Sequence, residues 1–258
     1  METTDRKEII EKDFITQKKR LDTLLYNEVL FEKINNNDEL KIIYPFAFLF
    51  TSYYKGVTYL LSEKLYSSVF PIARSALECF ANFSMLCECF NSPQFSEKYK
   101  ILQGKDIIQI CEIAKEEDDE NTKEFLMKTI ISKIREAGFD NIIESDNVEI
   151  KDIIKNIRKE IDNYEEYKTK QSALKSLDYL ENVYGNNTKF AKTIYADLCN
   201  LLHNNISGIM ERFCEKSEDK EVFCGEHYKA EMIIPIQEMF IVCGIYIENW
   251  LKNNILIA

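Results

Sequence analysis

Apolar residues recur at intervals of three and four along almost the whole chain, which is the spacing of one face of an α-helix. No stretch of useful length alternates apolar and polar residues with the period of two that is typical of a half-buried β-strand. We therefore predict an all-α fold, a multi-helix bundle of about eight or nine helices. The main helices are expected at about residues 5–34, 40–62, 67–90, 96–116, 188–216 and 231–253.

The middle of the chain, about residues 117–187, is more charged than the parts on either side. It follows the acidic run KEEDDEN, which is expected to be a solvated turn, and it contains shorter amphipathic segments that Gly138 and Gly185 are expected to end. We predict a single all-α domain over residues 1–258. Its core is formed by about residues 5–116 and 188–256, and about residues 117–187 form a helical insertion. The segment SEDKEVFCGEHY, residues 217–228, is expected to be a loop.

The composition favours long helices and argues against duplex DNA and membranes as partners. Seven glycines and four prolines in 258 residues are few for a fold that needs many tight turns. The chain has 33 basic and 44 acidic residues, a net charge of −11, which argues against non-specific binding to duplex DNA. The same charge disfavours anionic membranes, and no segment offers the ~20 clean apolar residues that a membrane span needs.

The eight cysteines lie mostly inside apolar helical stretches such as LECFANFSMLCECF, residues 77–90. The first residues, METTDRKEIIEKDF, contain no apolar signal region. We therefore expect a cytoplasmic chain whose cysteines are reduced and buried. Cys224 and His227 have the spacing of two metal ligands, but no second pair accompanies them, so we expect no metal and no cofactor.

His203 is one of only two histidines, and it lies in the stretch YADLCNLLHNN, residues 195–205, of an expected helix. Tyr195, Leu198 and Leu202 share an apolar stripe of that helix, and His203 projects about 100° from its centre. At this margin a ring is partly desolvated yet accessible to a substrate, which suits proton transfer. The alternative is a ring that hydrogen-bonds to a neighbouring helix and has no chemical role.

Arg74 and Glu78 form a second polar feature, on a helix that is apolar over about half its circumference. They lie four residues apart, with the arginine first, which is the less favourable order for a simple surface ion pair. In so apolar a helix the two charges must be paired or lie in a cleft. A structural bridge to another helix is the alternative.

Together, ARSALE, residues 73–78, and YADLCNLLH, residues 195–203, resemble a bacterial helical family related to the HEPN superfamily. The resemblance rests on an Arg-Ser-x-x-Glu helix followed by a later Tyr-x-x-Leu-(Ser/Cys)-x-x-x-His helix. It implies a helical bundle, commonly a homodimer, of the kind that cleaves RNA without a metal in toxin–antitoxin and phage-defence systems. The matching positions are Arg74, Ser75, Glu78, Tyr195, Leu198, Cys199 and His203.

This resemblance implies roles for the polar residues of both helices. His203 would be the general base or acid, Arg74 would stabilise charge on phosphorus, and Glu78 would hold the guanidinium. Asn200 would complete the catalytic set by orienting the ring, and the substrate would be bound by Asn204, Ser207 and Tyr195. The implied partners are RNA, a cognate antitoxin or another defence protein, and a second copy of the chain.

The sequence departs from the HEPN pattern at one point. The family usually has an arginine four to six residues before the histidine on the same helix, but Asp197 and Leu198 occupy the expected places here. Arg74 would have to replace that arginine, which requires the two helices to lie side by side. A non-catalytic binding or regulatory module with the same fold is therefore the alternative function.

Overall fold

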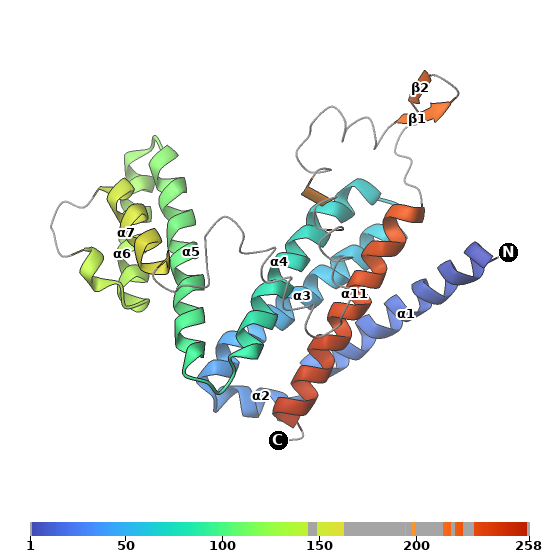
Figure 1. The fold of residues 1–258 in the computed structure, drawn as a ribbon, viewed down its shortest axis with the longest axis horizontal. Helices are drawn as coiled ribbons and strands as arrows, with labels where there is room; N and C mark the ends of the chain where they lie inside the picture. Colours follow the sequence, from blue (N-terminus) through green and yellow to red (C-terminus); the bar gives the residue numbers. More distant parts are fainter. Residues whose placement is uncertain are drawn as a thin grey trace. The chain divides into compact units, whose positions relative to one another are not determined.

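The computed structural model describes residues 2–143, 149–162, 194, 198–199, 214–217, 220–223 and 230–256 (Figure 1). Eight α-helices lie in these described ranges, so the predicted all-α, multi-helix fold is confirmed. The chain divides into two compact units. The first unit comprises Met1–Cys87 and Ser176–Ala258, and the second comprises Glu88–Lys175.

The first unit is built from helices at both ends of the chain. α1 (Glu2–Leu25), α3 (Asp38–Ser62), α4 (Val69–Glu88) and α11 (Ala230–Leu251) lie side by side (Figure 1). The short α2 (Glu28–Asn35) joins α1 to α3, a 3₁₀ turn at Tyr66–Ser68 precedes α4, and a π-helical turn at Lys252–Leu256 follows α11. Pro71 lies in the first turn of α4, where its missing N–H breaks no helical hydrogen bond.

The single helix expected over residues 5–34 is wrong, because the chain turns between α1 and α2. Asn27 causes the break: its side-chain oxygen accepts hydrogen bonds from the backbone N–H groups of Val29 (2.9 Å) and Leu30 (3.3 Å). This satisfies two of the donors that the first turn of a helix leaves unpaired. Asn37 caps α3 in the same way through Leu40 N–H (3.0 Å).

Aromatic rings from all four long helices meet in the core of the first unit. Tyr54 of α3 packs against Phe14 of α1, with ring centroids 4.6 Å apart, and against Phe240 of α11 at 4.9 Å. Phe80 of α4 contacts Phe50 of α3 at 5.9 Å. These five rings are at most 2% exposed, and each aromatic side chain buries a large apolar area that stabilises the bundle.

A buried polar contact also joins α1 to α11. The Gln17 side chain, 3% exposed, donates a hydrogen bond of 2.9 Å to the Glu248 carboxylate, which also accepts one from Lys252. Burial acts to raise the pKa of the Glu248 carboxyl, but the hydrogen bonds from Lys252 and Gln17, together with the positive charges of Lys252 and Arg20, hold the pKa below its ordinary value of 4.5. The carboxylate is therefore charged, paired and part of the helix interface.

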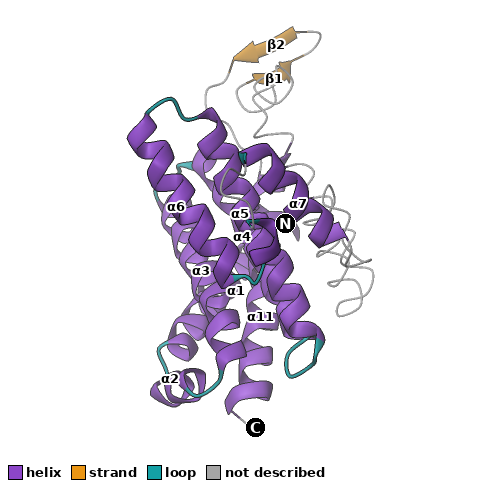
Figure 2. Cartoon of the chain, turned by 90° about the vertical axis from the view of Figure 1, so that its left-hand side faces the viewer, coloured by secondary structure: helices purple, strands orange, loops and turns teal. Residues whose placement is uncertain are grey.

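Within the described residues, the second unit has the helices α5 (Gln94–Glu116), α6 (Glu120–Glu136) and α7 (Ile150–Asp162), and a 3₁₀ turn at Asp140–Ile142 (Figure 2). α5 packs against both α6 and α7. The sequence predicted residues 96–116 in the core and a boundary near residue 117, whereas the second compact unit begins at Glu88. Gly138 follows α6 with a φ of +67°, so its expected role as a helix stop is confirmed.

A short antiparallel hairpin lies within the described part of residues 188–228. β1 (Cys214–Ser217) pairs with β2 (Lys220–Phe223), with Cys214 opposite Phe223 and Ser217 opposite Lys220. The helix predicted over residues 188–216 is therefore wrong from Cys214, where β1 begins. The loop predicted at residues 217–228 contains β2. Four-residue strands are too short to show a period of two clearly, which is why the pattern missed them.

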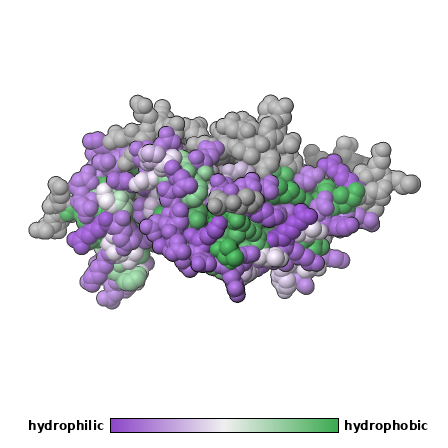
Figure 3. Space-filling model, turned by 90° about the horizontal axis from the view of Figure 1, so that it is seen from below, coloured by the Kyte–Doolittle hydropathy of each residue, from purple (hydrophilic) through white to green (hydrophobic). Residues whose placement is uncertain are grey.

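No helix in the described part of the chain is long and apolar enough to span a bilayer. Hydrophilic atoms dominate the face drawn in Figure 3, where hydrophobic atoms form separate patches. The expectation that the cysteines are buried is confirmed for five of them, and Cys199 is partly exposed. The buried five are Cys79, Cys87, Cys89, Cys111 and Cys243.

Close packing at one glycine of the second unit yields a first prediction. A Cβ added at Gly104 of α5 would lie 2.6 Å from Ile161 Cδ1 and 3.2 Å from Ile157 Cγ2 of α7. We expect Gly104→Ala to lower the free energy of unfolding by about 1–3 kcal/mol, measured by denaturant titration, because the core is overpacked.

Gly56→Ala in α3 is the matched control for Gly104→Ala. Its new Cβ would meet Ile72 at 3.6 Å, an ordinary contact, so only the helix propensity changes. We expect this variant to be more stable by about 0.5–1 kcal/mol. Equal gains at both glycines would contradict the close contact between α5 and α7.

The Glu248 contact predicts a pH dependence of stability. A carboxyl whose pKa is depressed in the folded state stabilises the fold above its unfolded pKa, and this contribution is lost as the pH falls through the folded pKa. The free energy of unfolding of the wild type should therefore fall more steeply below pH 4.5 than that of Glu248→Gln, which cannot titrate. Urea titrations at several pH values measure the difference. Parallel curves for the two proteins would contradict it.

Candidate functional site

α4 carries a narrow polar strip on an otherwise buried helix. Thirteen of its residues are buried, whereas Arg74, Ser75, Glu78 and Asn82 are partly exposed. The Arg74 side chain is 33% exposed and the Glu78 side chain is 41% exposed. The apolar residues on the rest of the helix fix its orientation in the bundle, so the strip is held rigidly at the surface of the first unit.

Arg74 and Glu78 contact each other directly on this strip. The Arg74 Nε–H donates a hydrogen bond of 3.2 Å to Glu78 Oε1. Sequence analysis required the two charges to be paired or to lie in a cleft, and the pairing is confirmed. Because both side chains are partly solvated, the pair adds at most about 1 kcal/mol to stability. Its main physical effect is to restrict the direction of the guanidinium plane.

Tyr53 of α3 is a member of this site that sequence analysis missed. Its side chain is half-buried, and burial raises the pKa of its phenol. Neighbouring Cys79 and the negative charge of Glu78 raise it further. The phenol therefore stays protonated and keeps a hydrogen-bond donor beside the carboxylate.

The aromatic stretch at residues 44–60, where Tyr53 lies, is only partly buried. Phe50 and Tyr54 belong to the core, whereas Phe48 and Tyr59 are exposed. In the sequence, only its position on the helix distinguishes Tyr53 from the core residues. It borders the buried line formed by Phe50, Tyr54 and Val57.

Cys79, next to Glu78 on α4, is not a nucleophile in this arrangement. Its thiol is 6% exposed and donates a hydrogen bond of 3.2 Å to the backbone carbonyl of Phe46. Burial raises the pKa of the Cys79 thiol to about 12, so the thiolate is scarcely populated near neutral pH. The site therefore offers a guanidinium, a carboxylate and a neutral phenol.

The five site residues expected on the later helix lie outside the described residues: Tyr195, Asn200, His203, Asn204 and Ser207. Three residues of that helix are described. Ile194 and Leu198 are helical and buried, and Cys199 is helical and partly exposed. The predicted apolar face is thus confirmed at Leu198. The meeting of His203 with Arg74 stays a prediction.

The described residues do not group His, Cys, Asp and Glu side chains in threes that could hold a metal ion. Cys87 and Cys89 are both buried, each 6% exposed, and Cys224 and His227 lie outside the described ranges. What the described part of the site can do is bind an anion. A guanidinium with a fixed direction presents several donors in the geometry that matches a phosphate group, and a phenol O–H adds a further donor.

Comparison with known proteins gives one match. The model of a protein family of unknown function, DUF5677, matches residues 49–221, which is more than half of the chain and includes both polar motifs. No curated protein and no solved structure matches the chain significantly. The chain, with Arg74 and Glu78 inside the matched region, therefore belongs to the DUF5677 family.

Proposed function

We propose that this protein is a HEPN-like, metal-independent endoribonuclease of bacterial stress or phage defence that acts in the cytoplasm. The observation that supports the proposal best is the Arg74–Glu78 pair, a guanidinium fixed by its Nε–H bond on the partly exposed strip of a buried helix. A cation that is both accessible and directed is suited to a phosphate of RNA.

The proposed chemistry uses the RNA's own 2′-hydroxyl as the nucleophile. The bond between the 2′-oxygen and phosphorus forms, the bond from phosphorus to the 5′-oxygen breaks, and the products end in a 2′,3′-cyclic phosphate and a 5′-hydroxyl. His203 takes the 2′-hydroxyl proton or returns a proton to the 5′-oxygen. Arg74 neutralises the charge that develops on the phosphate oxygens, and Tyr53 donates a hydrogen bond to them.

The remaining groups orient the reacting atoms. Glu78 holds the Arg74 guanidinium, Asn200 orients the His203 ring, and Asn204, Ser207 and Tyr195 bind the RNA. Since one histidine supplies one proton-transfer group, the second comes from a homodimer partner. A cognate antitoxin or another defence protein restrains the activity until infection or stress.

A non-catalytic binding or regulatory module is the second candidate, and a specific observation favours it. Asp197 occupies a place where HEPN nucleases usually have an arginine, so the helix of His203 brings a negative charge towards the phosphate instead of a positive one. In this case Arg74 and Tyr53 bind RNA or a phosphorylated ligand, and His203 makes a structural hydrogen bond.

Cleavage of RNA by purified protein in the presence of EDTA tests the proposal. We expect the wild type to release fragments with 2′,3′-cyclic phosphate ends, and His203→Ala to release none. Arg74→Lys should slow cleavage by roughly 100-fold or more, because lysine cannot reproduce the planar donors of arginine at the phosphate. Its free energy of unfolding should change by less than about 1 kcal/mol.

Arg158→Lys is the matched control for Arg74→Lys. Arg158 also bonds a glutamate, Glu112, at 3.2 Å, but it lies in the second unit, so the same substitution should leave the rate unchanged. If the wild type and His203→Ala bind RNA equally and neither cleaves it, the nuclease is excluded and the binding module is supported.

A further inference from the structure

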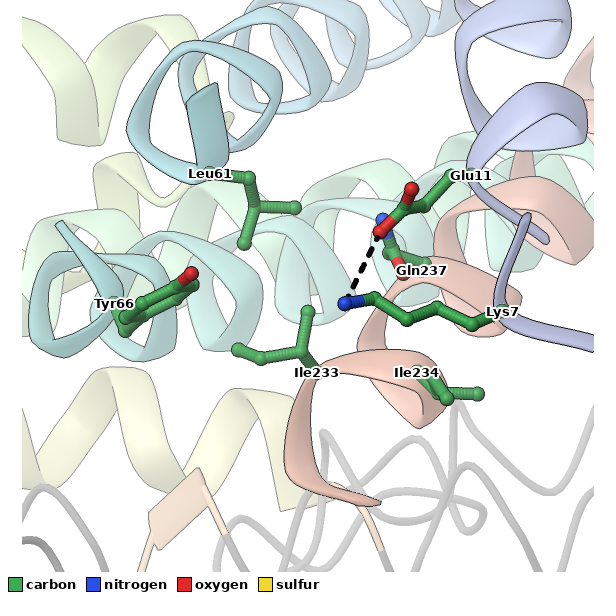
Figure 4. A pocket seen from close by; sticks show the side chains of 7 residues that line it. All are labelled: Lys7, Glu11, Leu61, Tyr66, Ile233, Ile234 and Gln237. Carbon is green, nitrogen blue, oxygen red and sulfur yellow. Dashed lines mark ion pairs between the residues drawn. The ribbon is translucent and has the colours of Figure 1, made fainter. Parts of the chain in front are cut away.

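A pocket in the first unit lies between the N-terminal part of α1, the C-terminal end of α3 and the beginning of α11 (Figure 4). Its volume is about 120 Å3. Leu61, Tyr66 and Ile233 supply apolar walls, and Lys7, Glu11 and Gln237 supply the polar groups. None of these residues belongs to the strip of α4 that carries Arg74.

Gln237 gives this pocket its chemical character. Its side chain is 5% exposed, yet it makes no hydrogen bond with any residue that the structure describes. A carboxamide has one acceptor oxygen and two N–H donors, and those of Gln237 are not fully sealed from solvent, so a ligand in the pocket can replace water at them. Gln17, the other buried glutamine among the described residues, is bonded to Glu248. Gln237 is therefore an unpaired amide that lines a cavity.

Two opposite charges that line the pocket balance each other. Lys7 Nζ lies 3.8 Å from Glu11 Oε1, and both side chains are about half exposed (Figure 4). Arg6 pairs with Glu238 at 2.8 Å on the same two helices, α1 and α11. A ligand with a net charge gains little from this balanced pair, so the pocket favours a neutral molecule.

The size and the walls restrict the ligand further. A cavity of about 150 Å3 in another protein holds one benzene molecule, so a pocket of about 120 Å3 accepts one ring and not two. Leu61, Ile233 and the Tyr66 ring can contact both faces of a flat molecule. A group with a donor next to an acceptor, as in a cis-amide, pairs with the oxygen and with one N–H of the Gln237 amide.

We propose that this pocket binds a small, neutral, one-ring molecule with an amide edge, the chemical class of the pyrimidine bases. The ring lies among Leu61, Tyr66 and Ile233, and its N–H and C=O groups form a pair of hydrogen bonds with Gln237. The base comes either from a free nucleobase or from a single-stranded RNA whose base enters the pocket.

Titration of the full chain with uracil, followed by calorimetry and by the NMR signals of the glutamine side-chain amides, tests this assignment. We expect uracil to shift the Gln237 amide signal. 1,3-Dimethyluracil has the same ring but no N–H, so it should bind more weakly by about tenfold or more. Equal binding of the two compounds, or no response to uracil at millimolar concentration, would overturn the proposal.

Two glutamine variants separate binding from folding. Gln237→Leu removes an unpaired amide, so it should abolish uracil binding while its thermal midpoint stays equal or rises. Gln17→Leu should lower the midpoint, because it leaves the buried Glu248 carboxylate without one of its donors, and it should leave uracil binding intact. A Gln237→Leu protein that still binds uracil would overturn the assignment.

A competition experiment identifies the source of the base. Displacement of uracil by an oligouridylate indicates an RNA base in the pocket, and lack of displacement indicates a free base; both outcomes support the amide pairing. Binding of the oligouridylate without any binding of uracil would overturn it. Arg74→Lys should bind uracil as the wild type does, so this test is independent of the proposed ribonuclease.

Discussion

The packing of Tyr54 between α1 and α11 is the interaction on which the first unit depends. Its ring contacts Phe14 and Phe240, and its hydroxyl donates a hydrogen bond of 2.8 Å to the Phe14 carbonyl. A buried tyrosine whose hydroxyl is satisfied adds both apolar area and a fixed orientation. Through this one residue α3 is fixed against both ends of the chain. The position of α3 in turn decides where Tyr53, the residue before Tyr54, meets the polar strip of α4.

Each of the two buried glutamines described in the first unit is either paired or lines a pocket. Gln17, Glu248 and Lys252 satisfy each other between α1 and α11, so they specify how the two helices align. Gln237, on the same α11, has no such partner among the described residues and lines a cavity instead. Since both amides are equally well buried, only the difference in pairing separates a structural glutamine from one that is available to a ligand.

The sequence predicted those features that depend on local spacing. The apolar period gave the all-α class, and the four-residue spacing of Arg74 and Glu78 gave their contact. It missed the break at Asn27, because a single capping side chain ends α1 and starts α2 within a continuous apolar pattern. It also missed Tyr53, whose role arises from the packing of α3 on α4, a long-range contact that helical spacing does not encode.

The contrast between a partly solvated surface strip and a pocket explains why the two candidate sites differ in chemistry. The strip of α4 faces outward from a helix that is otherwise buried, so a charge survives there with partial hydration and a paired carboxylate. The pocket at α11 is lined by a neutral amide and by one ion pair whose charges cancel, so it offers no net charge to a ligand. A charged phosphate therefore suits the first site and a neutral base suits the second. Because a nucleotide carries both groups, the two proposals share one chemical class of ligand, of which RNA is a member.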